Sequence, residues 1–221
     1  MNKIYVIGTP IGNLKDITLR AIEVLKSVDI ILAETPRVTL KLLNHLEIKK
    51  PVFNFFQNPT EKQIKDVLEW LKNGKEIAIV SEAGTPGVSD PGNKLINDLL
   101  LIDKEIQIIP IPGVSAVTAA ISVAGVNTQK FAFFGFVPKT KRNKFWQEIS
   151  DFEGTTIFFE SPFRIKKTLI EIKEKVLNKK RILIFRELTK TFEEIIRTDF
   201  DNLNENIKDM KDKGEFTILI Q

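Results

Sequence analysis

The sequence is poor in the side chains on which metal and thiol chemistry depend. Its 221 residues include no cysteine and one histidine, His45. This rules out disulfides and thiolate sites, and one histidine cannot form a multi-histidine centre, so no metal site is expected. A nucleophile–histidine–acid triad is not expected either. In the run Lys41–Leu46, His45 is predicted to have a surface or helix-end role.

Long apolar runs and nucleotide-binding motifs are also missing. No apolar run approaches the ~20 residues needed to cross a bilayer. The first residues read as a β-type run after one lysine and not as a signal peptide, so a cytoplasmic protein is expected. Neither the Rossmann G-x-G-x-x-G nor a phosphate loop ending in Gly-Lys-Ser/Thr occurs, which argues against kinases, NTPases and ordinary dehydrogenases.

Positive charge is mild overall but clustered. Lysine and arginine number 33 against 29 acidic residues, a net charge of +4. One cluster comprises Lys139, Lys141, Arg142 and Lys144, and a second comprises Lys166, Lys167, Lys173, Lys175, Lys179, Lys180 and Arg181. Such clusters suit a polyanionic partner, although a solvated helix face explains the second cluster equally well.

Three apolar runs each end in a tight loop rich in small residues. The most distinctive loop, Ser81–Gly92, contains three glycines, two prolines, two acids and three hydroxyl side chains. The run and loop pairs are Ile4–Ile7 with Gly8–Asn13, Ile77–Val80 with Ser81–Gly92, and Ile106–Ile109 with Pro110–Ala116. Glycine allows close backbone approach and proline fixes loop shape, so the sequence predicts a ligand site where these strands end.

The first half predicts an α/β lobe with a parallel sheet. Unbroken apolar runs are typical of strands covered on both faces, and helical patterns lie between them. One helix is predicted to open at Asp16, and another carries the capping box Thr60–Gln63 and stops at Gly74.

The second half predicts a mixed sheet. Strands are expected at 131–137, 155–159, 181–185, 194–198 and 216–220, with helices near 140–150, 162–177 and 201–212. No helix is apparent between Phe185 and Ile195, so an antiparallel pair is expected there. We therefore expect two α/β lobes, residues 1–112 and 113–221, with their loops facing a cleft.

Charged residues also gather at predicted strand ends. Glu34 and Arg37 follow one strand, and Glu160 and Arg164 follow another. Arg186, Glu187 and Lys190 share a third connection. Internal ion pairs and direct ligand contacts are equally good interpretations of these groups.

Seven motifs together carry a resemblance. They are Gly8–Leu14, Glu82–Gly92, Pro112–Ala116, Gly135–Lys139, Phe159–Arg164, Arg186–Lys190 and Gly214–Phe216. In this order, from the first residues to the last, they closely resemble the bacterial 2′-O-methyltransferases of small-subunit ribosomal RNA. That family lies within the tetrapyrrole methylase superfamily.

The resemblance implies S-adenosylmethionine as methyl donor, a two-lobed tetrapyrrole-methylase-like fold and a homodimer. It implies methylation of the ribose of cytidine 1402 in 16S ribosomal RNA, either free or in the assembled small subunit. By position, the cofactor residues would be Pro10, Glu82, Gly84, Thr85, Ser115 and Ala116, with Phe159, Leu188 and Glu215 as further candidates.

Candidate RNA-binding residues are Lys139, Lys141, Arg142 and Arg164. A ribose hydroxyl needs a general base, and without a usable histidine or cysteine the candidates are Glu34, Glu160, Glu187 and a neutral Lys190. Glu34 is favoured because Arg37 flanks it, and Arg37 suits RNA phosphate or an acid partner. Two alternatives stay open: a tetrapyrrole or protein substrate on the same scaffold, and a non-catalytic RNA-binding relative.

Overall fold

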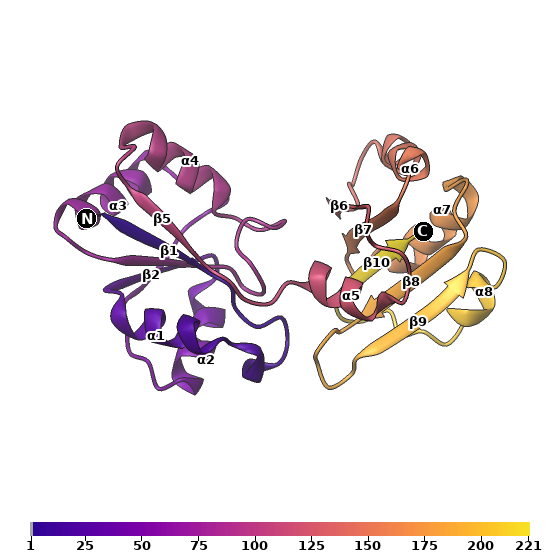
Figure 1. The fold of residues 1–221 in the computed structure, drawn as a ribbon, viewed down its shortest axis with the longest axis horizontal. Coiled ribbons are helices and arrows are strands. Elements are labelled where there is room, and N and C mark those ends of the chain that lie inside the picture. The colour runs from indigo at the N-terminus through magenta and orange to yellow at the C-terminus, as the bar shows by residue number, and fades with distance from the viewer. Residues whose placement is uncertain (1) are drawn as a thin grey trace. The chain divides into compact units, whose positions relative to one another are not determined.

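The computed structural model describes residues 2–221, which form two compact α/β units (Figure 1). The first ends at Ser115 and the second runs from Ala116 to Gln221, so the chain changes unit slightly beyond the boundary proposed after residue 112. The two units are described separately.

The first unit alternates strands and helices along the chain. Its elements are β1 (Lys3–Ile7), the 3-10 helix η1 (Leu14–Asp16), α1 (Leu19–Ser27), β2 (Ile30–Ala33), α2 (Pro36–His45), β3 (Val52–Asn54), α3 (Glu61–Lys72), β4 (Ile77–Val80), α4 (Asn93–Ile102) and β5 (Gln107–Ile111). The strands pair in the order β3-β2-β4-β1-β5, and every pairing is parallel, as the sequence predicts.

Both faces of this sheet are covered. Every residue of β2 and β4 is buried, which explains their unbroken apolar sequences. One core cluster joins the sheet to α3 and α4, and another joins it to α1 and α2. Figure 1 shows these two helix pairs on opposite sides of the first sheet.

Helix boundaries in the first unit follow capping chemistry. The capping box is confirmed, because Gln63 N–H bonds Thr60 Oγ1 (3.2 Å) and Thr60 N–H bonds Gln63 Oε1 (3.0 Å). The helix expected to open at Asp16 instead begins at Leu19, since Thr18 caps it by accepting a hydrogen bond from Ala21 N–H at 3.1 Å. His45 is the exposed last residue of α2.

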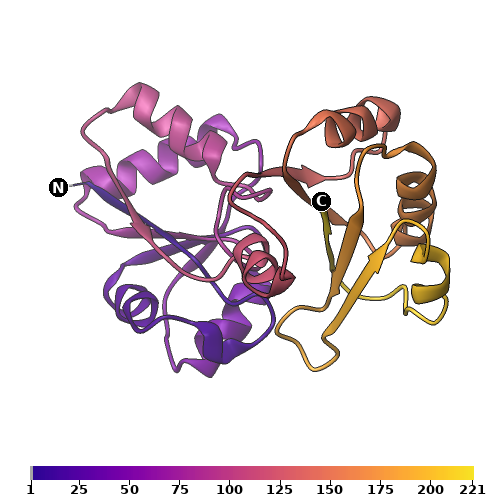
Figure 2. The same ribbon diagram turned by 45° about the vertical axis from the view of Figure 1, so that its right-hand side comes forward.

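The second unit is built on a mixed sheet. Its elements are α5 (Ala116–Ala124), β6 (Phe131–Phe136), α6 (Arg142–Asp151), β7 (Thr155–Glu160), α7 (Ile165–Lys175), β8 (Arg181–Arg186), β9 (Glu194–Asp199), α8 (Leu203–Asn206) and β10 (Phe216–Ile220). The order is β6-β7-β10-β8-β9, with β6–β7 parallel and the other pairs antiparallel. The predicted antiparallel pair is β8–β9, whose long ribbons are prominent in Figure 2.

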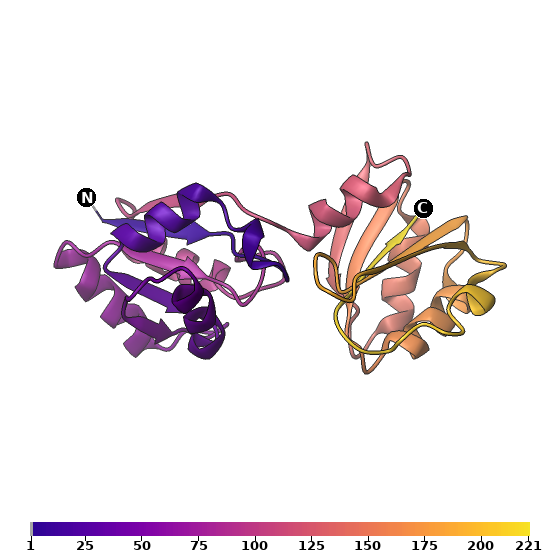
Figure 3. The same cartoon turned by 90° about the horizontal axis from the view of Figure 1, so that it is seen from below.

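The core of the second unit lies under α6 and α7. It includes Trp146 and Phe158, both fully buried. Figure 3 shows α5 on the other side of this sheet, where it contacts β10. No helix within residues 2–221 is both long enough and apolar enough to span a membrane.

The helix expected over 201–212 is much shorter. Only Leu203–Asn206 is helical, because asparagine and aspartate side chains here bond locally and compete with helix formation. Asn202 donates from its backbone and side chain to Asp199, at 2.8 and 3.0 Å. Asn206 Nδ2 donates to Thr198 Oγ1 at 2.8 Å.

Candidate functional site

The carboxyl ends of β4, β1 and β5 place the three predicted loops side by side. These strands are neighbours in the parallel sheet, so their loops leave from one edge. After β1 the chain enters α1, and after β4 it enters α4, on opposite faces of the sheet. The edge between β1 and β4 is therefore a topological switch point, where open α/β sheets bind ligands.

Backbone contacts join these loops directly. Thr9 and Gly84 exchange N–H···O bonds of 2.9 and 3.0 Å. Gly8 and Gly113 approach so closely that a Cβ on Gly113 would lie 2.7 Å from the Gly8 carbonyl oxygen. A Cβ on Gly8 would lie 2.8 Å from Gly113 Cα. Only glycine at both positions permits this contact.

The loop after β4 is held in one conformation. Thr85 Oγ1 donates to the Val114 carbonyl at 3.1 Å, tying this loop to the one after β5. Gly84 is buried with φ of +80°, a region that disfavours other residues. Pro10 is also buried, and Thr85, Ser115 and Ala116 are half-buried. The structure thus brings Pro10, Glu82, Gly84, Thr85 and Ser115 to one edge.

An acidic pair lies at the ends of β2 and β4. Thr35 Oγ1 donates to Glu82 Oε1, and Asn54 Nδ2 donates to the Glu34 carbonyl at 2.5 Å. Burial raises the pKa of the half-buried Glu34 carboxyl, and the Glu82 charge raises it further. In the described part of the chain, neither carboxylate forms an ion pair, and Arg37 is exposed and unpaired. This edge therefore carries uncompensated negative charge.

Three other predicted residues gather at one edge of the second sheet. Phe159 is opposite Thr217 in β10, and Glu215 immediately precedes that strand. Leu188, which is buried, follows Glu187, whose backbone N–H donates to the Glu215 carbonyl at 3.0 Å. Because β7 and β8 both run antiparallel to β10, all three residues meet at the same end of the sheet.

Glu187 and Lys190 form a tightly paired group there. Lys190 Nζ lies 2.9 Å from both Glu187 Oε1 and Glu215 Oε2. Burial opposes ionisation of Glu187, but hydrogen bonds from Lys190 and the Glu215 N–H outweigh it and lower the Glu187 pKa. Burial likewise opposes charge on Lys190, yet its hydrogen bonds to Glu187 and Glu215 raise the pKa. Lys190 thus stays protonated and does not suit the role of a neutral-lysine base.

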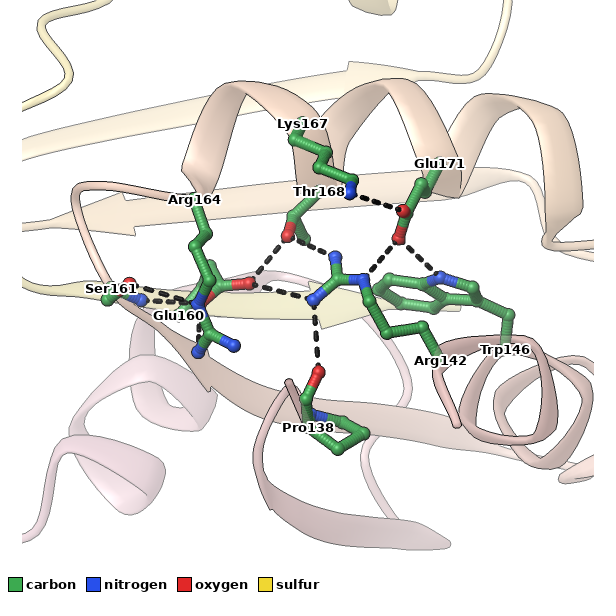
Figure 4. Close-up of polar contacts among 9 residues, drawn as sticks. All are labelled: Pro138, Arg142, Trp146, Glu160, Ser161, Arg164, Lys167, Thr168 and Glu171. Atoms are coloured by element: carbon green, nitrogen blue, oxygen red, sulfur yellow. Dashed lines mark hydrogen bonds and ion pairs between the residues drawn. The ribbon is translucent and has the colours of Figure 1, made fainter. Parts of the chain in front are cut away.

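Glu160 lies at the centre of a buried network (Figure 4). Its side chain is 0% exposed, and it accepts hydrogen bonds from Ser161 N–H (2.7 Å) and Thr168 Oγ1 (2.5 Å). Arg164 Nη2 pairs with it at 2.7 Å, and Arg142 Nη1 lies 3.8 Å away. A carboxylate so enclosed by partners within the protein does not suit the role of a base for a bound substrate.

Arg142 belongs to the same network, and this corrects the expectation that it binds RNA. Its side chain is 12% exposed and pairs with Glu171 at 2.7 Å. Arg142 also donates to Thr168 Oγ1 (2.8 Å) and to the Pro138 carbonyl (3.2 Å). Trp146 Nε1 shares the Glu171 carboxylate at 2.8 Å. The Arg142 guanidinium therefore bonds partners within the protein, whereas Lys139 and Lys141 are exposed.

Several of these partners were not anticipated from the sequence. Asn54 ends β3, a strand of three residues that is too short to predict from periodicity. Thr168 and Glu171 lie on the buried side of α7, among apolar neighbours. Polar residues on a core-facing helical stripe are the sequence signal that could have identified them.

Comparison with known proteins places these features in context. Residues 3–204 match the family of tetrapyrrole (corrin/porphyrin) methylases. The chain is 41% identical over 221 residues to the ribosomal RNA small subunit methyltransferase I of Thermotoga maritima, covering 100% of this chain and 98% of that protein. It is 38% identical over 223 residues to the protein of the same name from Bacillus subtilis, covering 100% and 75%.

Solved structures share the fold at lower identity. A cobalt precorrin-4 methyltransferase of cobalamin biosynthesis superposes with a TM-score of 0.68 at 21% identity, covering 99% of this chain and 94% of the other. A uroporphyrin-III C-methyltransferase from Thermus thermophilus gives 0.66 at 16% identity, with coverages of 99% and 94%. The two-sheet α/β architecture is thus that of the tetrapyrrole methylases.

The Gly8–Gly113 contact predicts non-additive destabilisation. Gly8→Ala and Gly113→Ala should each lower the free energy of unfolding by about 1–3 kcal/mol, because each Cβ meets backbone that cannot rotate away. Once one alanine has separated the loops, the second alanine should lower the free energy of unfolding by a smaller amount. Urea unfolding of both single variants and the double variant measures this coupling. Additive losses would show that the two glycines act independently.

The buried network predicts that Arg142 matters for stability. Arg142→Ala should lower the free energy of unfolding by about 3 kcal/mol, because the largely buried Glu171 carboxylate loses the guanidinium that lies 2.7 Å from it. Lys139→Ala should change it by no more than about 0.5 kcal/mol, since its side chain is exposed. Thermal and urea unfolding compare the two variants, with Arg142→Lys expected between them. Equal stability of all three would place Arg142 at the solvated surface.

Proposed function

The chain belongs to the tetrapyrrole (corrin/porphyrin) methylase family, and we propose that it is an S-adenosylmethionine-dependent methyltransferase that modifies the ribose 2′-hydroxyl of cytidine 1402 in 16S ribosomal RNA. The full-length relatives named ribosomal RNA small subunit methyltransferase I support the substrate class. One structural observation carries the proposal: the switch-point edge combines close-packed loops with an uncompensated acidic pair.

That edge fits the proposed cofactor chemically. S-adenosylmethionine carries a sulfonium and an ammonium against a single carboxylate, so it is a net cation near neutral pH. Glu34 and Glu82 supply negative charge with no cation paired to either among residues 2–221. The loops also lack the lysine of a triphosphate clamp. A cationic nucleoside therefore suits this edge better than a nucleotide phosphate does.

The cofactor contacts are proposed residue by residue. Pro10, Gly84 and Thr85 lie in the two loops that the Thr9–Gly84 bridge joins, and Ser115 and Ala116 end the third loop. Glu82 is proposed to face the cationic part of the cofactor. Phe159, Leu188 and Glu215 are proposed as further contacts.

Glu34 is the proposed general base. Bound S-adenosylmethionine supplies an electrophilic methyl group, but a ribose hydroxyl is a weak nucleophile until its proton is removed. Glu34 accepts that proton on its carboxylate, and its raised pKa brings its basicity closer to that needed near neutral pH. The hydrogen bond from Asn54 to the Glu34 carbonyl holds this segment in place.

The other candidate bases already form hydrogen bonds or ion pairs within the protein. Glu160 is buried with three hydrogen-bonding partners, and Lys190 is paired with two carboxylates. Glu187 is paired with Lys190 and has a lowered pKa, which weakens it as a base. Arg37 is proposed to hold RNA phosphate near Glu34, because it is exposed and permanently charged.

The proposed partners follow from the substrate. We propose that the protein acts in the cytoplasm as a homodimer on 16S ribosomal RNA, either free or assembled in the small subunit.

Methyl transfer to undermethylated small subunits tests the function and its base together. The parent protein should transfer a methyl group to the 2′-oxygen of cytidine 1402, and Glu34→Gln should lower kcat, measured at saturating cofactor, by at least ~100-fold. Glu69→Gln, at an exposed site on α3, serves as the matched control and should retain the parent rate. No transfer by the parent to subunits or free RNA would reject the function. Full activity in Glu34→Gln would reject only the base.

The acidic pair also predicts a pH shift. Glu34 must be ionised to accept a proton, so activity should fall as pH falls through its raised pKa. Glu82→Gln removes the like charge but leaves burial, the larger cause, in place. The acid limb of kcat/KM for RNA, measured at saturating cofactor, should therefore move to lower pH. An acid limb at the parent position would show that Glu82 does not influence the base.

A further inference from the structure

Two exposed phenylalanines lie at the carboxyl ends of the parallel strands β6 and β7. Phe163 is 97% exposed, the highest value for a large apolar side chain in the described part of the chain, and Phe136 is 53% exposed. Phe136 ends β6 opposite Phe159, and Phe163 follows the end of β7. A single exposed apolar residue is ordinary, but two aromatic rings at one sheet edge need an explanation.

The same edge carries unpaired positive charge. Lys139 and Lys141 follow Phe136, and both are exposed. Within residues 2–221, neither lysine has a carboxylate within ion-pair distance. The nearby acids Glu160 and Glu171 are already paired with Arg164 and Arg142. The local charge facing solvent is therefore positive.

The buried network fixes the backbone that presents these side chains. Arg142 bonds the Pro138 carbonyl, which lies between Phe136 and the two lysines. Glu160 binds Ser161 N–H and the Arg164 guanidinium, so both flanks of Phe163 are anchored to one buried carboxylate (Figure 4). The Arg164 N–H also bonds the Ser161 carbonyl at 3.1 Å. Phe163 is thus held on a rigid turn.

We propose that this aromatic–lysine surface, formed by Phe136, Lys139, Lys141 and Phe163, binds single-stranded RNA. Unstacked bases would stack on the phenylalanine rings, and Lys139 and Lys141 would neutralise phosphates. A duplex hides its base faces, so the surface selects segments with splayed bases. Charge is depleted at the core of protein interfaces, so the two unpaired lysines favour RNA over a second protein copy. The identity of the RNA rests on the proposed function.

Phe163→Ala tests the stacking role without disturbing the fold, because the ring is almost fully exposed. Binding to undermethylated small subunits should weaken at least about five-fold, while the dependence on salt stays as in the parent. Phe163→Tyr should restore binding, and Phe163→Leu should not, since leucine lacks an aromatic face. Phe131→Ala is the matched control: Phe131 is 45% exposed at the opposite end of β6, and the variant should bind as the parent does.

Replacing the two lysines should change the salt dependence of RNA binding as well as the affinity. Lys139→Ala with Lys141→Ala should weaken binding and flatten the salt dependence, with a slope smaller by about 0.7 for each phosphate that a lysine no longer neutralises. Cofactor affinity should not change in any of these variants.

Three results would overturn the inference. Parent-like RNA affinity in Phe163→Ala would remove the ring from the binding surface. Equal weakening in Phe131→Ala would mean that any exposed phenylalanine has this effect. A shift of Phe163→Ala from dimer to monomer in analytical ultracentrifugation, with RNA affinity unchanged, would assign the surface to contact between copies. Methyl transfer by the parent stays a separate measurement, so the proposed function can hold when this inference fails.

Discussion

Buried charge is the constraint on which much of this structure depends. Removing a carboxylate from water costs several kcal/mol unless donors replace its hydration. At Glu160 the replacement is complete, with hydrogen bonds from Ser161 and Thr168 and a pair with Arg164. Meeting this requirement links β7 to α7 and, through Arg142, to the start of α6. The hydrogen bonds and ion pairs that satisfy this one carboxylate thus hold the loops at this edge together.

At the proposed active edge of the first unit, by contrast, two carboxylates lie close together without a cationic partner. Glu34 and Glu82 lie close enough for one charge to raise the pKa of the other, and neither is paired with a cation among residues 2–221. Two neighbouring carboxylates disfavour each other's charge, and an acid whose pKa is raised in this way, as that of Glu34 is, is common at functional sites. The contrast between carboxylates paired with a cation and carboxylates without one thus separates structural acids from the proposed catalytic one.

The same reasoning connects stability with recognition in the second unit. Arg142 is only 12% exposed because it bonds Glu171 and the Pro138 carbonyl, and this leaves Lys139 and Lys141 as the exposed cations. Phe163 is displayed because both of its flanks are tied inward. A side chain on a fixed backbone loses less entropy on binding, so the exposed Phe163 ring can contribute to affinity.

The sequence by itself determined the secondary structure of most of the chain and the class of both sheets. Unbroken apolar runs required a covered parallel sheet, and the lack of a helix between Phe185 and Ile195 required an antiparallel pair. Ordered motifs identified the family because each constrains backbone as well as chemistry. Where local bonding competes with periodicity, as with the asparagines around α8, the sequence pattern was misleading.

Only the tertiary structure decided which charged residues face each other. Arg142, Lys139 and Lys141 read alike in the sequence, yet Arg142 is half-buried against Glu171 and the two lysines are exposed. The reason is that α7 places an acid beside Arg142 alone. The partners Glu34 and Glu82 are far apart in the chain and meet because β2 and β4 are adjacent strands. Pairings between distant residues follow from strand order and helix packing, which local sequence does not specify.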